Sequence, residues 1–320
     1  MIRESLGELK YRPKYTAVSR TGRRTCCPGV PRQATGFAMR AWSFSRIFPV
    51  ALIVAAGVWL YAGTLRELLQ TWLTDGNYSH GLVVAPVAAA IAYSRRRKLA
   101  ELPIAPSGRG NLLLAVGLLM FAFSRWSDVT FLAGLSLVVV IAGLVWTFAG
   151  PKVLRELAFP IAFLVFMTPP PDFFVEKIGA PLQRASCSYS AMVGGLCGFD
   201  VESQGVMLFA NGLKFEVDLP CSGIRAINCL TAFSAVLAYL ARTSPLGRAL
   251  IFLAAVPVAF AANVLRVLVV IVVANIDSLK ADVMSFHDAS GPVMFLLALG
   301  VVLLLKRRFE CSWRDDVVPI

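Results

Sequence analysis

Long apolar runs, separated by short charged segments, dominate the pattern of the chain. A bilayer core requires about 20 apolar residues per helix, and several of the runs are shorter than this. We predict an all-α polytopic membrane protein with about eight transmembrane helices. Their approximate bounds are 47–63, 80–93, 111–124, 129–149, 157–169, 223–241, 249–275 and 291–305.

The segment 170–221 is the longest one between two predicted spans. It opens with "PPPDFF", which cannot continue a helix. Apolar residues then recur at helical spacing and predict an amphipathic helix at the membrane surface; they are Phe174, Ile178, Leu182, Ala185, Tyr189, Met192, Val193 and Leu196. Asn211-Gly212 favours a tight turn, and alternation after it predicts a β-hairpin.

Composition and charge support the membrane assignment and set an orientation. The chain is 57% hydrophobic and only 16% charged, with a net charge of +12. Most of its 31 Lys and Arg residues lie in segments that a cytoplasmic N-terminus would keep inside. We therefore predict that both termini are cytoplasmic and that nucleic acid is not a partner. "DGNYSHG" (75–81), segment 170–221 and "FHDASG" (286–291) then face outward.

The predicted organisation has three parts. Residues 1–44 are basic and lack an apolar run, so we expect a disordered cytoplasmic tail rather than a secretory signal; translation could equally start at Met39. Residues 45–306 form the transmembrane domain, with 170–221 as its extracytoplasmic insertion. Residues 307–320 form a cytoplasmic C-terminal tail.

Cys221 lies in "EVDLPCSGIR", between the predicted strand and a helix that begins near Ile224. Ser222 and Gly223 are capping or turn residues in this reading. A thiol at a helix N-terminus is stabilised as thiolate by the backbone dipole and by free N–H groups, so Cys221 is a candidate nucleophile. A buried structural cysteine is the alternative.

Four further residues carry or support candidate chemistry. Arg266 lies inside the span 249–275, where a guanidinium needs a polar partner or cavity, and Asn263 precedes it by one helical turn. Snorkelling to the outer headgroups is the alternative for Arg266. His287 precedes the last span and is a candidate acid and base near neutral pH. His80 is its rival on the same face.

A thiol, a guanidinium and an imidazole on one side of the membrane meet the requirements of covalent acyl transfer. The cysteine attacks a peptide carbonyl, the arginine stabilises the oxyanion or binds a carboxylate, and the histidine moves the proton. The seven cysteines show no metal-ligand spacing, so we expect neither a metal nor another cofactor. Cys187 and Cys197 could form a disulfide in an oxidising compartment, and the sequence alone is compatible with both the paired and the free state.

The residues resemble the exosortase/archaeosortase family. "PCSGIR" with Cys221, "ANVLRV" with Asn263 and Arg266, His287 before the last span, and "NYSHG" with His80 carry the resemblance over roughly residues 45–306.

This resemblance implies a cysteine transpeptidase of the bacterial inner membrane with its active site on the periplasmic face. Its partners would be exported proteins that end in a short motif, a transmembrane helix and a basic cluster, in bacteria that often make exopolysaccharide. It implies Cys221 as nucleophile, Arg266 as stabiliser, His287 as acid and base, and Asn263 as a positioning residue.

Two other functions remain open from the residues. Eight spans with a membrane arginine also fit a transporter, although no inverted repeat is visible. A non-catalytic scaffold of a polysaccharide export system is the third reading.

Overall fold

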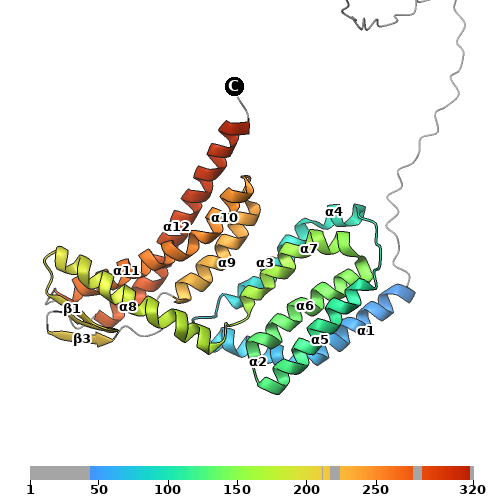
Figure 1. The fold of residues 1–320 in the computed structure, drawn as a ribbon, viewed down its shortest axis with the longest axis horizontal. Helices are drawn as coiled ribbons and strands as arrows, with labels where there is room; N and C mark the ends of the chain where they lie inside the picture. The colour runs from blue at the N-terminus through green and yellow to red at the C-terminus, as the bar shows by residue number, and fades with distance from the viewer. Residues whose placement is uncertain (1–43, 211, 217–223, 277–282, 318–320) are drawn as a thin grey trace, which may run out of the picture. The chain divides into compact units, whose positions relative to one another are not determined.

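The computed structural model describes residues 44–210, 212–216, 224–276 and 283–317. The chain divides into two units at Leu52 and Ile53, and the contacts given below lie within the second. Its described elements are helices and one small sheet (Figure 1).

The first group of helices precedes residue 168. It comprises α1 (Phe44–Leu60), α2 (Ala62–Thr74), α3 (Gly81–Ser94), α4 (Arg96–Glu101), α5 (Arg109–Ser127), α6 (Thr130–Ala149), α7 (Pro151–Phe163) and the 3₁₀ turn η1 (Leu164–Met167).

The second group begins with the long helix α8 (Asp172–Leu196) and the strands β1 (Val201–Gln204), β2 (Met207–Ala210) and β3 (Leu213–Glu216). The helices α9 (Ile224–Leu240), α10 (Pro245–Leu253), α11 (Ala255–Ala274) and α12 (Val283–Val317) follow.

The helices make this a multi-pass membrane protein, but the predicted number of eight spans is too high. In the described residues, four helical segments are long and apolar enough to cross a bilayer: Arg109–Ser127, Thr130–Ala149, Pro245–Ala274 and Ala289–Cys311. A fifth is possible only if Ala51–Leu60 and Ala62–Thr74, which are bent by 61°, form one broken span.

Length explains the difference. The runs predicted at 80–93, 157–169 and 223–241 are helical, but α3 has 14 residues, α7 has 13 and α9 has 17. At 1.5 Å per residue these helices cover roughly 20–26 Å, less than the ~30 Å of a hydrocarbon core.

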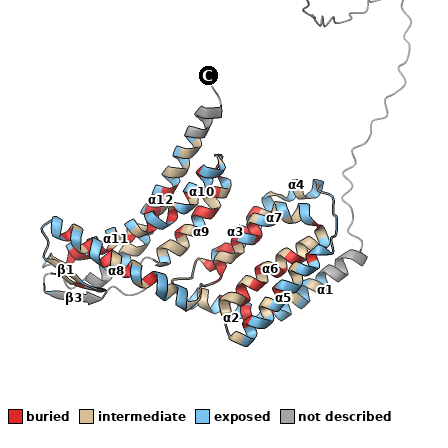
Figure 2. Ribbon diagram, viewed as in Figure 1, coloured by how far each residue is buried: buried red, intermediate tan, exposed pale blue. Residues whose placement is uncertain are grey.

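The outer sides of the long helices expose large apolar residues, whereas small and apolar residues are buried where helices face one another (Figure 2). Leu112, Leu119, Leu296 and Leu304 are each about two-thirds or more exposed, at 74%, 69%, 65% and 65%. Exposure of many large apolar side chains is typical of a surface that meets lipid.

The predicted hairpin is confirmed, within a sheet of three antiparallel strands in the order β1-β2-β3. Ala210 pairs with Leu213 across the two-residue turn, and Gly212 has a φ of +76°, a conformation that glycine adopts without a steric penalty. Strand β1 was not predicted. The part of the predicted strand beyond Glu216 lies outside the described residues.

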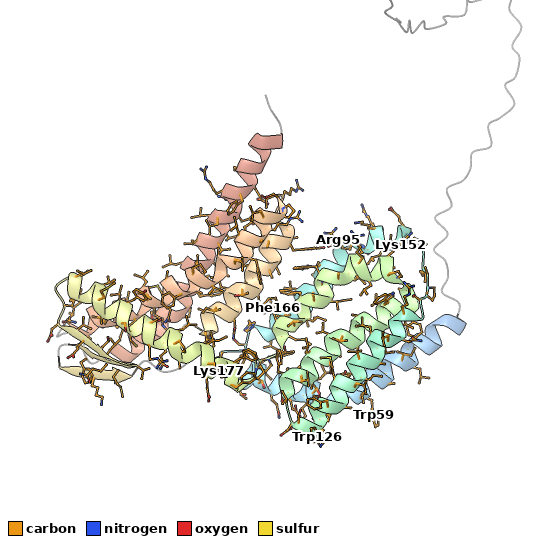
Figure 3. All side chains as sticks on the ribbon, viewed as in Figure 1. Trp59, Arg95, Trp126, Lys152, Phe166 and Lys177 are labelled. Atoms are coloured by element: carbon orange, nitrogen blue, oxygen red, sulfur yellow. The ribbon has the colours of Figure 1, made fainter. Side chains whose placement is uncertain are left out.

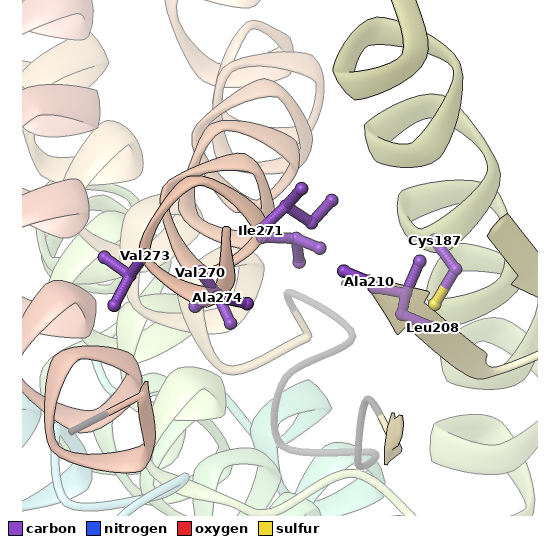
Figure 4. Packing of buried hydrophobic residues seen from close by; sticks show 8 residues of the cluster. Cys187, Leu208, Ala210, Val270, Ile271, Val273 and Ala274 are labelled. Carbon is purple, nitrogen blue, oxygen red and sulfur yellow. The ribbon is translucent and has the colours of Figure 1, made fainter. Parts of the chain in front are cut away.

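The sheet shares a hydrophobic core with α8 and with the C-terminal part of α11. Leu208 and Ala210 of β2 are buried against Cys187 of α8 and Ile271 of α11 (Figure 4). This core fixes the sheet to the end of α11 that lies beyond Arg266, and so supports the helix that carries the candidate arginine.

Helix α8 confirms the predicted helix after the prolines. Much of its predicted apolar stripe is exposed: Ile178 by 52%, Met192 by 56% and Leu196 by 81%. The buried face instead carries small polar residues, including Ser186 and Ser190, which allow α8 to approach α11 closely. Its predicted place at the membrane surface stays a prediction.

Helix α9 contacts two separate cores. Leu230 and Ala238 pack with residues of α10, α11 and α12, whereas Ala232 and Ala235 pack with α2, α3, α7 and η1. Helix α9 therefore joins the two groups of helices.

The turn before α3 is fixed by a close contact at Gly81. A Cβ there would overlap the indole of Trp72. That indole cannot move freely, because its Nε1 donates a 2.9 Å hydrogen bond to the carbonyl of Met167.

We expect Gly81→Ala to destabilise the protein by about 1–3 kcal/mol, the usual effect of overpacking a close contact. The thermal unfolding midpoint in detergent, followed by circular dichroism, should fall. Gly300→Ala is the matched control, because a Cβ at this position within α12 would meet nothing within 4 Å. An unchanged midpoint for Gly81→Ala would contradict the packing described here.

Candidate functional site

A cavity of about 760 Å³ lies among α3, α9, α11 and the beginning of α12. Apolar side chains form most of its wall. Its polar lining residues are Ser79, His80, Arg225, Cys229 and Arg266. The cavity therefore brings together residues that are up to 187 positions apart in the sequence, and two of them, His80 and Arg266, are predicted site residues.

Arg266 is directed from α11 towards α12. Its Nε donates a hydrogen bond of 3.3 Å to Ser290 Oγ, and a Cβ built on Gly291 would lie 3.5 Å from one of its terminal nitrogens. Membrane depth makes such a polar setting necessary for a guanidinium. His287 lies one turn before Gly291 in α12; its side chain lies outside the described residues.

Asn263 contacts α8, whereas Arg266 on the same helix contacts α12. It is buried, at 5% exposure, and its Nδ2 donates a 3.1 Å hydrogen bond to Ser186 Oγ of α8. Ser190 Oγ also donates to the carbonyl of Val264, at 3.2 Å. These bonds fix the rotation of α11 and hence the direction of Arg266. A direct positioning contact from Asn263 to Arg266 stays a prediction.

His80 ends a short ordered turn before α3. The amide of Asn77 donates to Asp75 Oδ1 at 2.8 Å, and Ser79 Oγ donates to the carbonyl of Gly76 at 3.1 Å. The imidazole Nδ1 is buried and has no hydrogen-bond partner among the described residues.

Burial lowers the pKa of His80 below its ordinary value, because it disfavours the charged ring. The nearby charge of Arg225 lowers this pKa further, whereas backbone groups of Phe166 and Asn77 act in the opposite direction. Burial thus favours the neutral form of the His80 ring over the charged form.

Arg225 is the site residue that the sequence interpretation missed. It lies in the first turn of α9, lines the cavity, and rests on the turn before α3, where a Cβ at Gly76 would be 3.3 Å from both terminal nitrogens. Its position four residues after Cys221 was the signal available in the sequence.

The remaining predicted residues Cys221, Ser222 and Gly223 lie outside the described residues. They immediately precede Ile224, where α9 begins as predicted.

The structure excludes the disulfide between Cys187 and Cys197. Both thiols are free, the first buried and the second exposed. Ten helical residues separate them by about 15 Å, more than twice the Cα separation that a disulfide allows. Burial raises the pKa of Cys187 to about 11, so this thiol is protonated and unreactive.

Comparison with known families gives one match. The family described as transmembrane exosortase matches residues 72–304, more than half of the 320-residue chain. No curated protein and no solved structure matches. The matched range contains every predicted site residue and all residues that line the cavity.

Proposed function

The chain belongs to the transmembrane exosortase family, and from this premise we propose that it is a membrane-embedded cysteine transpeptidase or protease. It cleaves the C-terminal sorting signal of exported proteins through a thioacyl intermediate, and it serves surface protein sorting in bacteria that make exopolysaccharide. Its catalytic domain is residues 45–306, within which the family match lies.

In the proposed reaction, the Cys221 thiolate attacks the carbonyl carbon of the scissile peptide bond. Arg266 donates hydrogen bonds to the oxygen that becomes negative, and His287 gives a proton to the departing amine. The C–N bond breaks and a thioester to Cys221 remains. The N-terminus of α9 favours the thiolate, since the free N–H groups there stabilise negative charge.

The cavity is the observation that supports this proposal. The chain enters α9 at Ile224, three residues after Cys221, and Arg225 in that first turn lines the cavity. Arg266 lines it from α11, and α12, which carries His287, contributes Gly291 and more of the wall. The cavity wall thus includes α9, which begins three residues after Cys221 in the sequence, and the helices α11 and α12 that carry Arg266 and His287.

We propose that both termini are cytoplasmic and that the cavity opens towards the periplasm of the inner membrane. This orientation requires that α3, α7 together with η1, and α9 also cross the bilayer, although each is shorter than a full span. The distribution of charge supports this orientation. Arg95 and Lys152 lie at the end of the helices opposite to Trp126 (Figure 3). At that basic end, Glu156 accepts from Lys98 at 2.7 Å and from Arg95 at 3.3 Å, which holds α4 against α7.

Two exposed thiols test the orientation. Cys197 follows α8 on the proposed outer side, and Cys311 lies near the end of α12 on the proposed inner side. In single-cysteine variants, a membrane-impermeant maleimide should label Cys197 in intact spheroplasts and Cys311 only after permeabilisation. Labelling in the reverse order would contradict the orientation.

The function itself is tested with an exported reporter that carries a C-terminal motif, a transmembrane helix and a basic cluster, using a panel of tails from the source organism. Co-expression with the wild-type chain should yield a reporter shortened at its C-terminus. The host without the chain is the control. Intact reporters throughout the panel, with the chain folded in the membrane, would count against a sorting function.

A further inference from the structure

A strongly basic surface is formed by α4 and by the first turns of α5 and α7. Residues 95–109 and 150–156 contain seven basic and two acidic residues. The seven basic residues, which we call the basic surface, are Arg95, Arg96, Arg97, Lys98, Arg109, Lys152 and Arg155. Two of them, Arg95 and Lys152, are seen at the same end of the helices in Figure 3. None of the seven lines the cavity, so the proposed reaction gives this charge no role.

Contacts between neighbouring elements hold the basic surface together. The carboxylate of Glu156 in α7 accepts from Arg95 at 3.3 Å and from Lys98 at 2.7 Å. The segment between α4 and α5 is bound to the end of α6, because the amide of Ser107 donates to the carbonyl of Thr147 at 3.2 Å. The basic side chains therefore lie on elements whose positions are fixed relative to one another.

The basic surface keeps most of its positive charge. Glu156 is shared by two cations, so its single negative charge neutralises only one of them. Arg97, Lys152 and Arg155 are exposed and form no ion pair with any residue that the structure describes. Several like charges on one surface attract an anion more strongly than a single charge does. These three side chains are thus available to an anion from outside the chain.

Large apolar side chains border the basic surface and are exposed. Leu112 is 74% exposed and follows Arg109 by three residues, and Phe148 is 50% exposed and precedes Lys152 by four residues. Both belong to helices that are long and apolar enough to cross a bilayer, α5 and α6. Arg109 is the first residue of α5, and Phe148 is the last but one of α6. The charge therefore lies where these two helices would leave the hydrocarbon core.

We propose that the basic surface binds the phosphodiester headgroup of an anionic phospholipid, whose acyl chains lie against the exposed apolar side chains of α5 and α6. Basic residues next to a membrane helix attract anionic lipids of the adjacent leaflet. A soluble acidic peptide or a nucleic acid would meet the charge but leave the apolar side chains in water. The proposal depends neither on the cysteine mechanism nor on which side of the membrane this surface faces.

Binding of the lipid should stabilise the fold. The headgroup lies among cations of α4 and α7 that otherwise repel one another. A ligand that binds only the folded chain raises its stability with increasing ligand concentration. The thermal unfolding midpoint therefore reports on binding.

The first test compares lipids on the full wild-type chain, purified in a neutral detergent and followed by circular dichroism. Mixed micelles with phosphatidylglycerol should raise the unfolding midpoint, whereas those with phosphatidylcholine, which has no net charge, should leave it unchanged. Added salt should reduce the effect, because screening weakens attraction between exposed charges. Equal stabilisation by the two lipids would contradict the proposal.

The second test removes the three unpaired charges together, with the combined variant Arg97→Gln, Lys152→Gln and Arg155→Gln. Each basic residue near an anionic headgroup contributes to binding, so the dissociation constant for phosphatidylglycerol, measured by native mass spectrometry, should rise by about 10-fold or more. Without lipid, the midpoint should stay at the wild-type value, because these side chains form no ion pair with any described residue.

The matched control combines Arg242→Gln, Arg307→Gln and Arg308→Gln. It removes the same amount of charge from exposed positions after α9 and in α12, which lie outside the basic surface. Its affinity for phosphatidylglycerol should stay within about twofold of the wild-type affinity, since only surface charges close to a headgroup act strongly on it.

Three results would overturn the proposal. The first is wild-type affinity for phosphatidylglycerol in the variant of the basic surface. The second is an equal loss in the control variant, which would make the effect one of net charge. The third is equal stabilisation of the wild type by inorganic phosphate or by a polyglutamate peptide, which would assign the surface to a free anion or to an acidic protein.

Discussion

Cys221→Ala is expected to abolish cleavage of a reporter that the wild-type chain processes, lowering the rate by a factor of about 1000 or more. Removing the nucleophile of a covalent mechanism removes the reaction path itself, and only weak residual catalysis by the rest of the site remains. The intact precursor should accumulate, as seen by immunoblotting of membranes. Cys197→Ala is the matched control, since this thiol is exposed at the end of α8.

The same variant separates the proposed function from its rivals. A transporter or a scaffold would keep its activity after loss of a single thiol, provided that the protein still inserts. Cys229 also lines the cavity, so it is the rival nucleophile. If Cys229→Ala stopped processing and Cys221→Ala did not, the nucleophile would have been assigned to the wrong residue.

Arg266→Lys should lower the processing rate by about 100-fold or more, the usual effect of removing a donor to an oxyanion. Lysine keeps the positive charge but lacks the planar fork of N–H donors of a guanidinium. Its single ammonium group cannot replace both these donors and the hydrogen bond from Arg266 Nε to Ser290 Oγ. The initial rate of reporter cleavage in purified membranes measures the effect.

Arg242→Lys is the control for this substitution, because Arg242 is exposed just after the end of α9 and does not line the cavity. If Arg266→Lys were fully active while the protein level was unchanged, Arg266 would have only a structural or topological role.

The helices were predictable because a helix in contact with lipid needs an apolar sequence, and such runs are visible in the sequence itself. The runs at 129–149 and 249–275 correspond closely to α6 and to the combined span Pro245–Ala274. Local chemistry also placed the turn at Asn211-Gly212 and the start of α8 after the prolines. In each case the deciding interaction lies within a few residues of the element.

Features that depend on distant contacts were not predictable. The break between α1 and α2 falls at Tyr61, which is buried and shares a 3.0 Å hydrogen bond with Ser136, 75 positions away. Asn263 lies on the face expected for contact with Arg266, yet it bonds Ser186 across 77 positions.

The role of Arg225 depends in the same way on tertiary structure. In the sequence, Arg225 is one of several basic residues in the predicted extracytoplasmic segments. Only the fold places its guanidinium against the turn that carries His80.

Mass spectrometry of the wild-type chain, quenched in acid during turnover of a reporter, tests the central claim most directly. We expect the tryptic peptide that contains Cys221 to carry the mass of the reporter's new C-terminal acyl group, in a bond that hydroxylamine cleaves. Shortened reporter without any adduct on this peptide, or an adduct on another cysteine, would contradict the account.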